Sequence, residues 1–320
     1  MKLTLRWSVA VCVALCNRVV LWTCSAETRF SAEAMPSEIT KEATCDDWAS
    51  WVPPRTDPAV VMQVVSEDYV DLEKNFIRLM ELNSVLTRQH MFLMCLDDAS
   101  LTIFASLGIR CVPVGALRFR SHKDLWKIRV RTVSCLVTAG YNIIMSDSDA
   151  LWLGDPMEYM TLPAVRGASV IASRGGFPHD LGGEWGSTIC MGFVMFRATG
   201  AGMNTFQDTM GRIVLETGDD QVSVNRAAQE LGIAWDKGSD MRYMESTSFG
   251  KGTIANLSSD DGEPFDIALL PHSKFTRICR RTPVSNDTMV AHCIQKHNAY
   301  AKLGWMQQLN LWAPDGIISP

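Results

Sequence analysis

Residues 141–156 have the sequence YNIIMSDSDALWLGDP, and this stretch carries the strongest indication of both fold and chemistry. An apolar run ends at Met145, two aspartates follow at Asp147 and Asp149, and apolar residues resume at Leu151. A buried strand that ends in two acids places negative charges at the rim of a core, where an unpaired charge is costly. We therefore expect a cation or a positively charged ligand there. Oxygen ligands suit a hard divalent ion such as Mg²⁺ or Mn²⁺, which can in turn bind a phosphorylated substrate.

A simpler interpretation is that the acid pair caps a helix or lies in a solvated turn, because Asp-x-Asp also occurs by chance. The flanking residues favour the metal site. Surface turns are rarely preceded by Ile-Ile-Met and followed by Leu-Trp-Leu, as this pair is.

Segments of strand and helical character alternate upstream of the acid pair. Strands are expected at 59–65, 91–96, 109–114 and 142–145, and helices at 69–86, 101–107 and 125–138. Alternation with short connections predicts βαβ units, a parallel sheet and a Rossmann-like α/β domain. Ligands of such sheets bind beyond the carboxyl ends of the strands, which is where the acid pair lies. Further strands are expected at 170–172 and 192–196, and further helices at 203–216 and 220–231.

The N-terminal segment 1–26 predicts entry into the secretory pathway. Basic residues precede an apolar stretch, and small residues at 24–26 resemble a signal-peptidase site. The alternative is a type II membrane anchor, in which Arg18 would cost about 2.5–3.5 kcal/mol. Both alternatives place the rest of the chain in the secretory lumen, and the sequons at Asn256 and Asn286 agree with that location.

Composition sets the remaining bounds on the chain. The polar segment 27–57 predicts a stem, and 58–320 predicts one compact domain, because no long linker divides it. Hydrophobic residues make up 47% of the chain, which is ample for a core. The formal net charge of −5 gives no sign of a nucleic-acid-binding surface.

Seven cysteines follow the N-terminal segment, and an odd number leaves at least one unpaired. Cys95, Cys111 and Cys135 lie in apolar runs and are interpreted as small buried hydrophobic residues. The better disulfide candidates are Cys45, Cys190, Cys279 and Cys293, whose pairing the sequence leaves open.

Three further features carry candidate chemistry. Asp219 or Asp220 is expected to cap the helix that follows it. His292 ends a short apolar run; a lone histidine is usually structural, but imidazole is also a common metal ligand. The third is a basic and aromatic tail, interpreted as a solvated helix face with buried tryptophans; it comprises Lys296, His297, Lys302, Trp305 and Trp312.

Taken in order, these features resemble the nucleotide-diphospho-sugar transferase family. The motifs are GYNIIMSDSDALWLGDP (140–156), CMGFVMFRAT (190–199), DDQ (219–221), LLP (269–271), VAHC (290–293) and KLGW (302–305). Members of the family are retaining glycosyltransferases of the GT-A fold, a Rossmann-like α/β fold with a mixed, mostly parallel sheet flanked by helices. They include plant cell-wall xylosyl- and arabinosyltransferases. The resemblance implies a nucleotide-sugar donor, a divalent metal ion, usually Mn²⁺, and residence in the Golgi as a type II membrane protein, which favours an uncleaved anchor.

The resemblance also implies roles for single residues. Asp147 matches an acid that contacts the ribose or the donor sugar. Asp149 and His292 match the ligands of the metal ion, and an imidazole beside carboxylates favours Mn²⁺ over Mg²⁺. Asp220 and Gln221 match an acid–amide pair near the reacting face of the sugar.

Lys127 matches a family lysine, assigned to the diphosphate side of the pocket. The chain departs from the family pattern at two places. Cys190-Met191-Gly192 stands where the family commonly has Asn-Thr-Gly, and Ile294 replaces a usual Asn. Both departures leave the identity of the donor open and are compatible with reduced activity.

The expected function is metal-dependent transfer of a sugar from a UDP-sugar to a hydroxyl group of a polysaccharide or glycoprotein, with retention of configuration. Either the leaving phosphate accepts the proton of the acceptor on the same face, or Asp220 acts as nucleophile in a double displacement. The sequence does not distinguish these mechanisms.

Two alternatives remain. One is a weakly active or inactive lumenal protein that binds nucleotide sugars on the same scaffold, which Cys190 and Ile294 support. The other is a phosphatase of the haloacid-dehalogenase type, with Asp147 as nucleophile and Asp149 as acid/base. Phosphatase motifs of that type usually follow the first strand, whereas here the motif follows three strands and continues with Ala150.

Overall fold

A computed structural model describes residues 44–53, 56–114, 121–277, 284–292 and 298–312. The strands are β1 Val60–Val65, β2 Met91–Cys95, β3 Cys111–Pro113, β4 Ile143–Ser146, β5 Ala150–Trp152, β6 Val170–Gly175, β7 Thr188–Phe196, β8 Ile233–Trp235, β9 Gly250–Ser258, β10 Pro264–Leu269, β11 Phe275–Arg277 and β12 Val290–His292. The helices are α1 Cys45–Ser50, α2 Val70–Asn83, α3 Asp98–Ser106, α4 His122–Thr138, α5 Met157–Met160, α6 His179–Trp185, α7 Ala201–Thr217, α8 Asp220–Glu230 and α9 Ala299–Gln308, with short 3₁₀ turns η1 Glu67–Tyr69 and η2 Arg88–His90.

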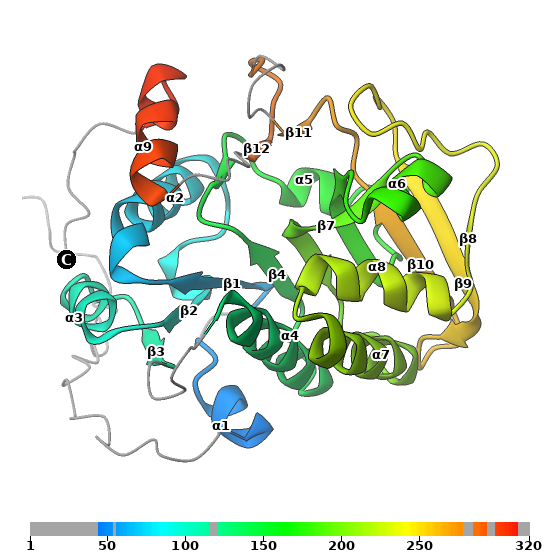
Figure 1. Ribbon diagram of the computed structural model, residues 1–320, viewed down its shortest axis with the longest axis horizontal. Coiled ribbons are helices and arrows are strands. Elements are labelled where there is room, and N and C mark those ends of the chain that lie inside the picture. The colour runs from blue at the N-terminus through cyan, green and yellow to red at the C-terminus, as the bar shows by residue number, and fades with distance from the viewer. Residues whose placement is uncertain (1–43, 54–55, 115–120, 278–283, 293–297, 313–320) are drawn as a thin grey trace, which may run out of the picture. The chain divides into compact units, whose positions relative to one another are not determined.

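The strands form two sheets (Figure 1). The larger has nine strands in the order β3-β2-β1-β4-β7-β6-β10-β9-β8, and β7 and β9 run opposite to the other strands. The smaller has the order β11-β12-β5. The expected strands and helices are present with shifted ends, so the prediction of a mixed α/β fold with a mostly parallel sheet is confirmed.

Helices cover both faces of the larger sheet because its central strands are apolar on both sides. In β1, Val60 and Met62 join a core cluster with residues of α4, α7 and α8. Val61 and Val65 point the other way and join a second cluster with residues of α2, α3 and α5. Such strands, apolar at successive positions, are typical of parallel sheets covered on both faces.

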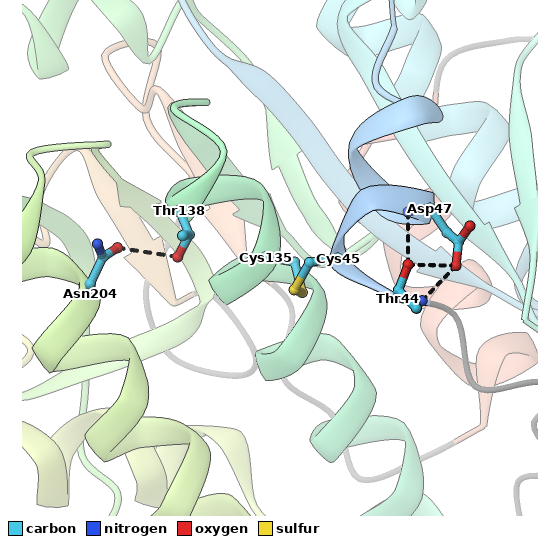
Figure 2. Close-up of a disulfide and its surroundings, with 6 residues drawn as sticks. All are labelled: Thr44, Cys45, Asp47, Cys135, Thr138 and Asn204. Atoms are coloured by element: carbon cyan, nitrogen blue, oxygen red, sulfur yellow. Dashed lines mark hydrogen bonds between the residues drawn. A yellow bond between two sulfur atoms is a disulfide. The ribbon is translucent and has the colours of Figure 1, made fainter.

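Two disulfide bonds are present among the described residues. Cys95 is bonded to Cys111 between β2 and β3, and Cys45 is bonded to Cys135 between α1 and α4 (Figure 2). The prediction that Cys45 forms a disulfide is confirmed. Cys95, Cys111 and Cys135 are buried, as predicted, but they are bonded in disulfides and are not simple buried hydrophobic residues. A buried disulfide lies in the same apolar surroundings as a buried thiol, so the sequence pattern does not distinguish them.

Cys190 differs from these four cysteines. It is buried and forms no disulfide in the described part of the chain, so its prediction as a disulfide candidate was wrong. The two remaining disulfide candidates, Cys279 and Cys293, lie outside the described residues.

The start of the described chain lies within the predicted stem 27–57, yet it packs on the domain. Thr44 caps α1 through a capping box with Asp47 (Figure 2). Trp48 is 1% exposed, and its ring lies 6.2 Å from that of Phe92 in β2. The predicted leader 1–26 lies outside the described residues. No helix in the described part of the chain has the length and apolar character needed to span a membrane.

We predict that the disulfide between α1 and α4 contributes strongly to stability. Its two cysteines are 90 residues apart in the sequence. Replacing both, as Cys45→Ser/Cys135→Ser, should lower the free energy of unfolding by about 2–5 kcal/mol in urea denaturation. The matched control, Cys95→Ser/Cys111→Ser, opens a loop of only 16 residues and should cost about 1.5 kcal/mol less by loop entropy. Equal losses for the two pairs would contradict this account.

A buried acid in α2 makes stability depend on pH. The Glu73 side chain is fully buried, and its carboxylate oxygens accept no hydrogen bond from any described residue. Burial raises the pKa of Glu73 to about 8. The folded state therefore keeps a proton that the unfolded state loses above its ordinary pKa of about 4.5, so stability falls as the pH rises from about 4.5 to 8.

We predict that Glu73→Met removes this pH dependence. The wild type should lose up to about 1.4 kcal/mol of stability per pH unit relative to the variant between pH 5 and pH 7.5. Urea denaturation at both pH values measures the difference. Glu184→Met, at an exposed position of α6, serves as the control. A stability difference between wild type and Glu73→Met that is the same at both pH values would show that the buried carboxyl is not responsible.

Candidate active site

The acid pair lies where β4 ends. β4 pairs antiparallel with β7, and the backbone N–H of Asp147 donates to the carbonyl of Gly192 over 2.9 Å. The N–H of Ala150 then donates to the carbonyl of Asp147 over 2.8 Å, which closes a tight turn. The turn places both carboxylates beyond the carboxyl end of β4, as the sequence predicts.

The smaller sheet places His292 beside the acid pair. β5 begins directly after Asp149 and pairs antiparallel with β12, so that Ala150 lies opposite His292. The pairing therefore brings together two candidate metal ligands that are far apart in the sequence. Ser148 and Asp149 are buried in this turn, and His292 is 4% exposed.

The three candidate ligands fit a divalent ion. One ligand atom from each of Asp147, Asp149 and His292 lies within 4.8 Å of the others. Nε2 of His292 is 3.6 Å from Oδ2 of Asp147 and 3.6 Å from Oδ1 of Asp149, which is longer than a hydrogen bond. Ligand atoms bound about 2.1 Å from one octahedral ion lie about 3–4.2 Å apart. Two carboxylates and an imidazole are also a donor set that suits Mn²⁺.

Arg129, on α4, neutralises the acids around the turn. Its guanidinium lies 3.0 Å from Oδ1 of Asp147 and 3.5 Å from Oδ2 of Asp220, and it also donates to the carbonyl of Met191. Burial opposes ionisation of Asp147, but Arg129 and His292 outweigh it and hold the pKa of this carboxyl well below its usual range. Asp147 is therefore an anion at neutral pH.

His292 lies between groups that favour its charged form. Burial lowers the pKa of the imidazole, but the carboxylates of Asp147 and Asp149 and the thiol of Cys190 more than offset this and raise the pKa well above its usual value. Sγ of Cys190 is 3.9 Å from Nδ1 of His292. In the absence of a metal ion, the site therefore favours an imidazolium between the two carboxylates.

Lys302 of α9 also contacts the acid pair. Its Nζ lies 2.8 Å from Oδ2 of Asp149, and the side chain is 15% exposed. The interpretation of Lys302 as part of a solvated helix face was therefore wrong. Lys296 and His297 of the same predicted tail lie outside the described residues.

The acid–amide pair lies at the start of α8. The side chain of Asp219 accepts a hydrogen bond from the N–H of Val222, so Asp219 is the helix cap. Asp220 is free of that role and is 6% exposed, and burial raises its pKa to about 6 although Arg129 opposes the shift. The amide of Gln221 donates to the carbonyl of Phe177 over 2.7 Å.

These residues surround one cleft with a volume of about 220 Å³. The cleft is lined by Trp126, Arg129, Asp147, Asp149, Phe177, Met191, Gly192, Asp219, Asp220, Gln221, Arg277, His292 and Lys302. Five of the six site residues predicted from the sequence are in this set. The sixth, Lys127, is on α4 but does not line the cleft, whereas its neighbours Trp126 and Arg129 do. Its assignment to the diphosphate remains a prediction without support from the cleft.

The basic residues Arg129 and Arg277 were not predicted from the sequence to line the site, and Lys302 was predicted to lie on a solvated helix face. A signal for Arg129 exists in α4, because it occupies the same face as the buried Thr132 and Val133. An arginine at a core-facing position indicates a buried anionic partner. Lys302 and Arg277 have no comparable signal in their segments.

Gly192 is required by the close packing of the site. A Cβ at this position would overlap with Cε1 of His292 and lie 2.8 Å from Oδ2 of Asp147. Cys190 and Met191 differ from the family pattern, but Gly192 matches it. Gly192 is the residue that allows β7 to approach the acid pair and His292.

We predict that Gly192→Ala displaces His292 and lowers Mn²⁺ affinity at least about tenfold while the fold is retained. Titration calorimetry with Mn²⁺ and circular dichroism measure the two properties. Gly211→Ala on α7 is the matched control, because its added Cβ meets no atom within 4 Å. Unchanged Mn²⁺ affinity in Gly192→Ala would contradict the proposed ligand geometry.

The mixed α/β sheet therefore carries an acid pair beyond the end of β4, inside a charged cleft. Residues 87–304 match the model of the nucleotide-diphospho-sugar transferase family. The chain belongs to this family.

Solved structures of glycosyltransferases resemble parts of the chain at low sequence identity. The glycosyltransferase GlyE of Streptococcus pneumoniae TIGR4 is 10% identical over 81% of this chain and 65% of its own, with a TM-score of 0.46. The galactosyltransferase LgtC, in complex with donor and acceptor sugar analogs, is 10% identical over 80% of this chain and 97% of its own, with a TM-score of 0.42. Mouse xyloside xylosyltransferase 1 is 12% identical over 54% of this chain and 82% of its own, with a TM-score of 0.33.

The chain covers 38% of the bifunctional glycosyltransferase WbbM and, as stated, 65% of GlyE, less than two thirds of each. A comparison with curated proteins gave no match.

Proposed function

We propose that the protein transfers a sugar from a UDP-sugar to a hydroxyl group of a polysaccharide or glycoprotein, with retention of configuration and with Mn²⁺ as cofactor. The observation that carries this proposal is the convergence of Asp147, Asp149 and His292 at the end of β4, inside the cleft of a nucleotide-diphospho-sugar transferase.

The residues of the cleft have different roles in binding the donor. Asp149 and His292 would bind the metal ion, which when bound supplies Lewis-acid stabilisation of the negative charge on the departing diphosphate. Asp147 orients the ribose or the donor sugar, and Arg129 keeps its carboxylate ionised and fixed. Arg277 adds a further cationic group to the lining of the cleft, and its guanidinium would bind the diphosphate of the donor.

The acid–amide pair favours a same-face reaction over a double displacement. The carboxylate of Asp220 is paired with Arg129, and this reduces its nucleophilicity. The NH₂ group of Gln221 is fixed by the carbonyl of Phe177, which leaves the amide oxygen to stabilise positive charge on the sugar. The bond from the anomeric carbon to the phosphate oxygen breaks, the acceptor oxygen bonds to that carbon on the same face, and its proton passes to the leaving phosphate.

We further propose that the protein works in the lumen of the secretory pathway, in the Golgi as a type II membrane protein, or secreted if the N-terminal segment is cleaved. Two disulfides support an oxidising compartment. The sequon residue Asn286 is exposed in a turn, which makes it accessible to glycosylation.

The family match disfavours the phosphatase alternative. The ion pair with Arg129 also disfavours it, because it neutralises Asp147, which would be the nucleophile of a phosphatase. The binding-protein alternative differs from the proposal only in turnover, so the experiment below separates them.

We predict Mn²⁺-dependent hydrolysis or transfer from at least one of UDP-Gal, UDP-Xyl, UDP-Glc and UDP-arabinose. Asp149→Asn should lower that activity at least about 100-fold, because it removes a charged ligand of the ion. Asp208→Asn, an exposed position of α7, is the control and should leave activity unchanged. Turnover without any divalent ion would refute the metal assignment, whereas UDP and Mn²⁺ binding without turnover would favour the binding protein.

A further inference from the structure

An ammonium group of the protein lies against a proposed metal ligand. Nζ of Lys302 is 2.8 Å from Oδ2 of Asp149, and the Asp149 side chain is 4% exposed. A divalent ion bound by the same carboxylate would lie close to a positive charge in a largely buried site. Like charges at such short range repel strongly where water screens them little.

The position of Lys302 is built into the fold and is not the chance contact of a surface chain. Its helix, α9, is capped by Asn298, whose side chain accepts a hydrogen bond from the N–H of Ala301. α9 lies beside α2 (Figure 1), where Asn75 of α2 donates to the carbonyl of Leu311 just beyond α9. Nζ of Lys302 is also 5.5 Å from the ring of Tyr69, which gives it a second favourable contact.

The acids around the proposed metal site already have cationic partners. The lining of the cleft contains Asp147, Asp149 and Asp220, and it also contains Arg129 and Lys302. Arg129 pairs with Asp147 and Asp220, and Lys302 pairs with Asp149. A divalent ion that binds Oδ1 of Asp149 beside His292 would share this carboxylate with the ammonium on Oδ2, and the two positive charges would repel each other.

We propose that Lys302 is a resident counter-ion that competes with the divalent ion for Asp149 and moves to the diphosphate when the donor binds. The donor supplies two or more negative charges to the same cleft, so the ammonium gains a new partner as it releases the carboxylate. Metal and nucleotide diphosphate therefore bind cooperatively, and each raises the affinity of the other by the same factor. The inference rests on the proposed metal site.

A purely structural role for Lys302, which would only attach α9 to the domain, makes different predictions. Loss of the ammonium would then lower stability and leave the affinity for Mn²⁺ unchanged or reduced. Competition predicts the opposite sign for Mn²⁺, because the neutral side chain no longer occupies or repels the ion's position.

The test is Mn²⁺ binding, measured by electron paramagnetic resonance of the free ion, with and without UDP. Lys302→Met should bind Mn²⁺ alone about tenfold more tightly than the wild type. The factor by which UDP raises Mn²⁺ affinity should fall by about tenfold in the same variant, because Lys302 no longer links the two sites. Lys302→Arg keeps the charge and should stay within about threefold of the wild type.

Two controls complete the design. Lys237→Met makes the same charge change at an exposed position after β8 and should leave Mn²⁺ affinity unchanged. Asp149→Asn, alone and combined with Lys302→Met, should abolish tight Mn²⁺ binding. Circular dichroism verifies folding, and Lys302→Gln replaces Lys302→Met if the latter does not fold.

Three outcomes overturn the inference. Mn²⁺ affinity of the folded Lys302→Met variant that equals or falls below the wild-type value excludes competition. If UDP does not change the affinity of the wild type for Mn²⁺, Lys302 does not move from Asp149 to the diphosphate. If neither the wild type nor Lys302→Met binds Mn²⁺ through Asp149, with or without UDP, the proposed metal site fails and the inference fails with it. If the wild type binds Mn²⁺ tightly through Asp149 but Lys302→Met binds Mn²⁺ no more tightly, the inference about Lys302 is refuted and the proposed metal site stands.

Discussion

The antiparallel pairing of β5 with β12 is the constraint on which the site depends. It places His292 opposite Ala150 and hence beside Asp149, although the two strands come from distant parts of the chain. Side chains alternate between the faces of a strand, so a register shift of one residue would turn the imidazole away from the carboxylates. The large sheet supplies the acid pair, and the small sheet supplies its third partner.

Charge compensation is the second requirement. A turn that buries Asp149 and orients Asp147 into a cleft is stable only with cations nearby, and Arg129, His292 and Lys302 provide them. The same ion pairs hold the acids in place. In the proposed function, these ion pairs would stabilise the site before the donor binds and would also position the acids for a metal ion and a diphosphate.

The sequence predicted those features that local patterns determine. The alternation of apolar strands and amphipathic helices located β1, α2, β2, α3, β3, α4 and β4, and the break in the last apolar run located Asp147 and Asp149. The order of short motifs then linked His292, Asp220 and Gln221 to the same site, and the cleft contains all of them.

The features that it missed depend on partners far away in the chain. β5 and β12 have three residues each, too few for a periodic pattern to appear. A cysteine in an apolar run looks the same whether it is paired, as Cys95 is, or unpaired, as Cys190 is. Lys302 looks like a solvated lysine because its partner, Asp149, is contributed by a distant segment. Only tertiary structure supplies such partners.

The most direct test of the account is to locate the ion. Crystals grown with Mn²⁺ and UDP, measured at the manganese absorption edge, should show an anomalous difference peak between the side chains of Asp149 and His292, in contact with both and with the diphosphate. A manganese peak elsewhere in the cleft, or bound UDP with no manganese at these two side chains, would contradict it.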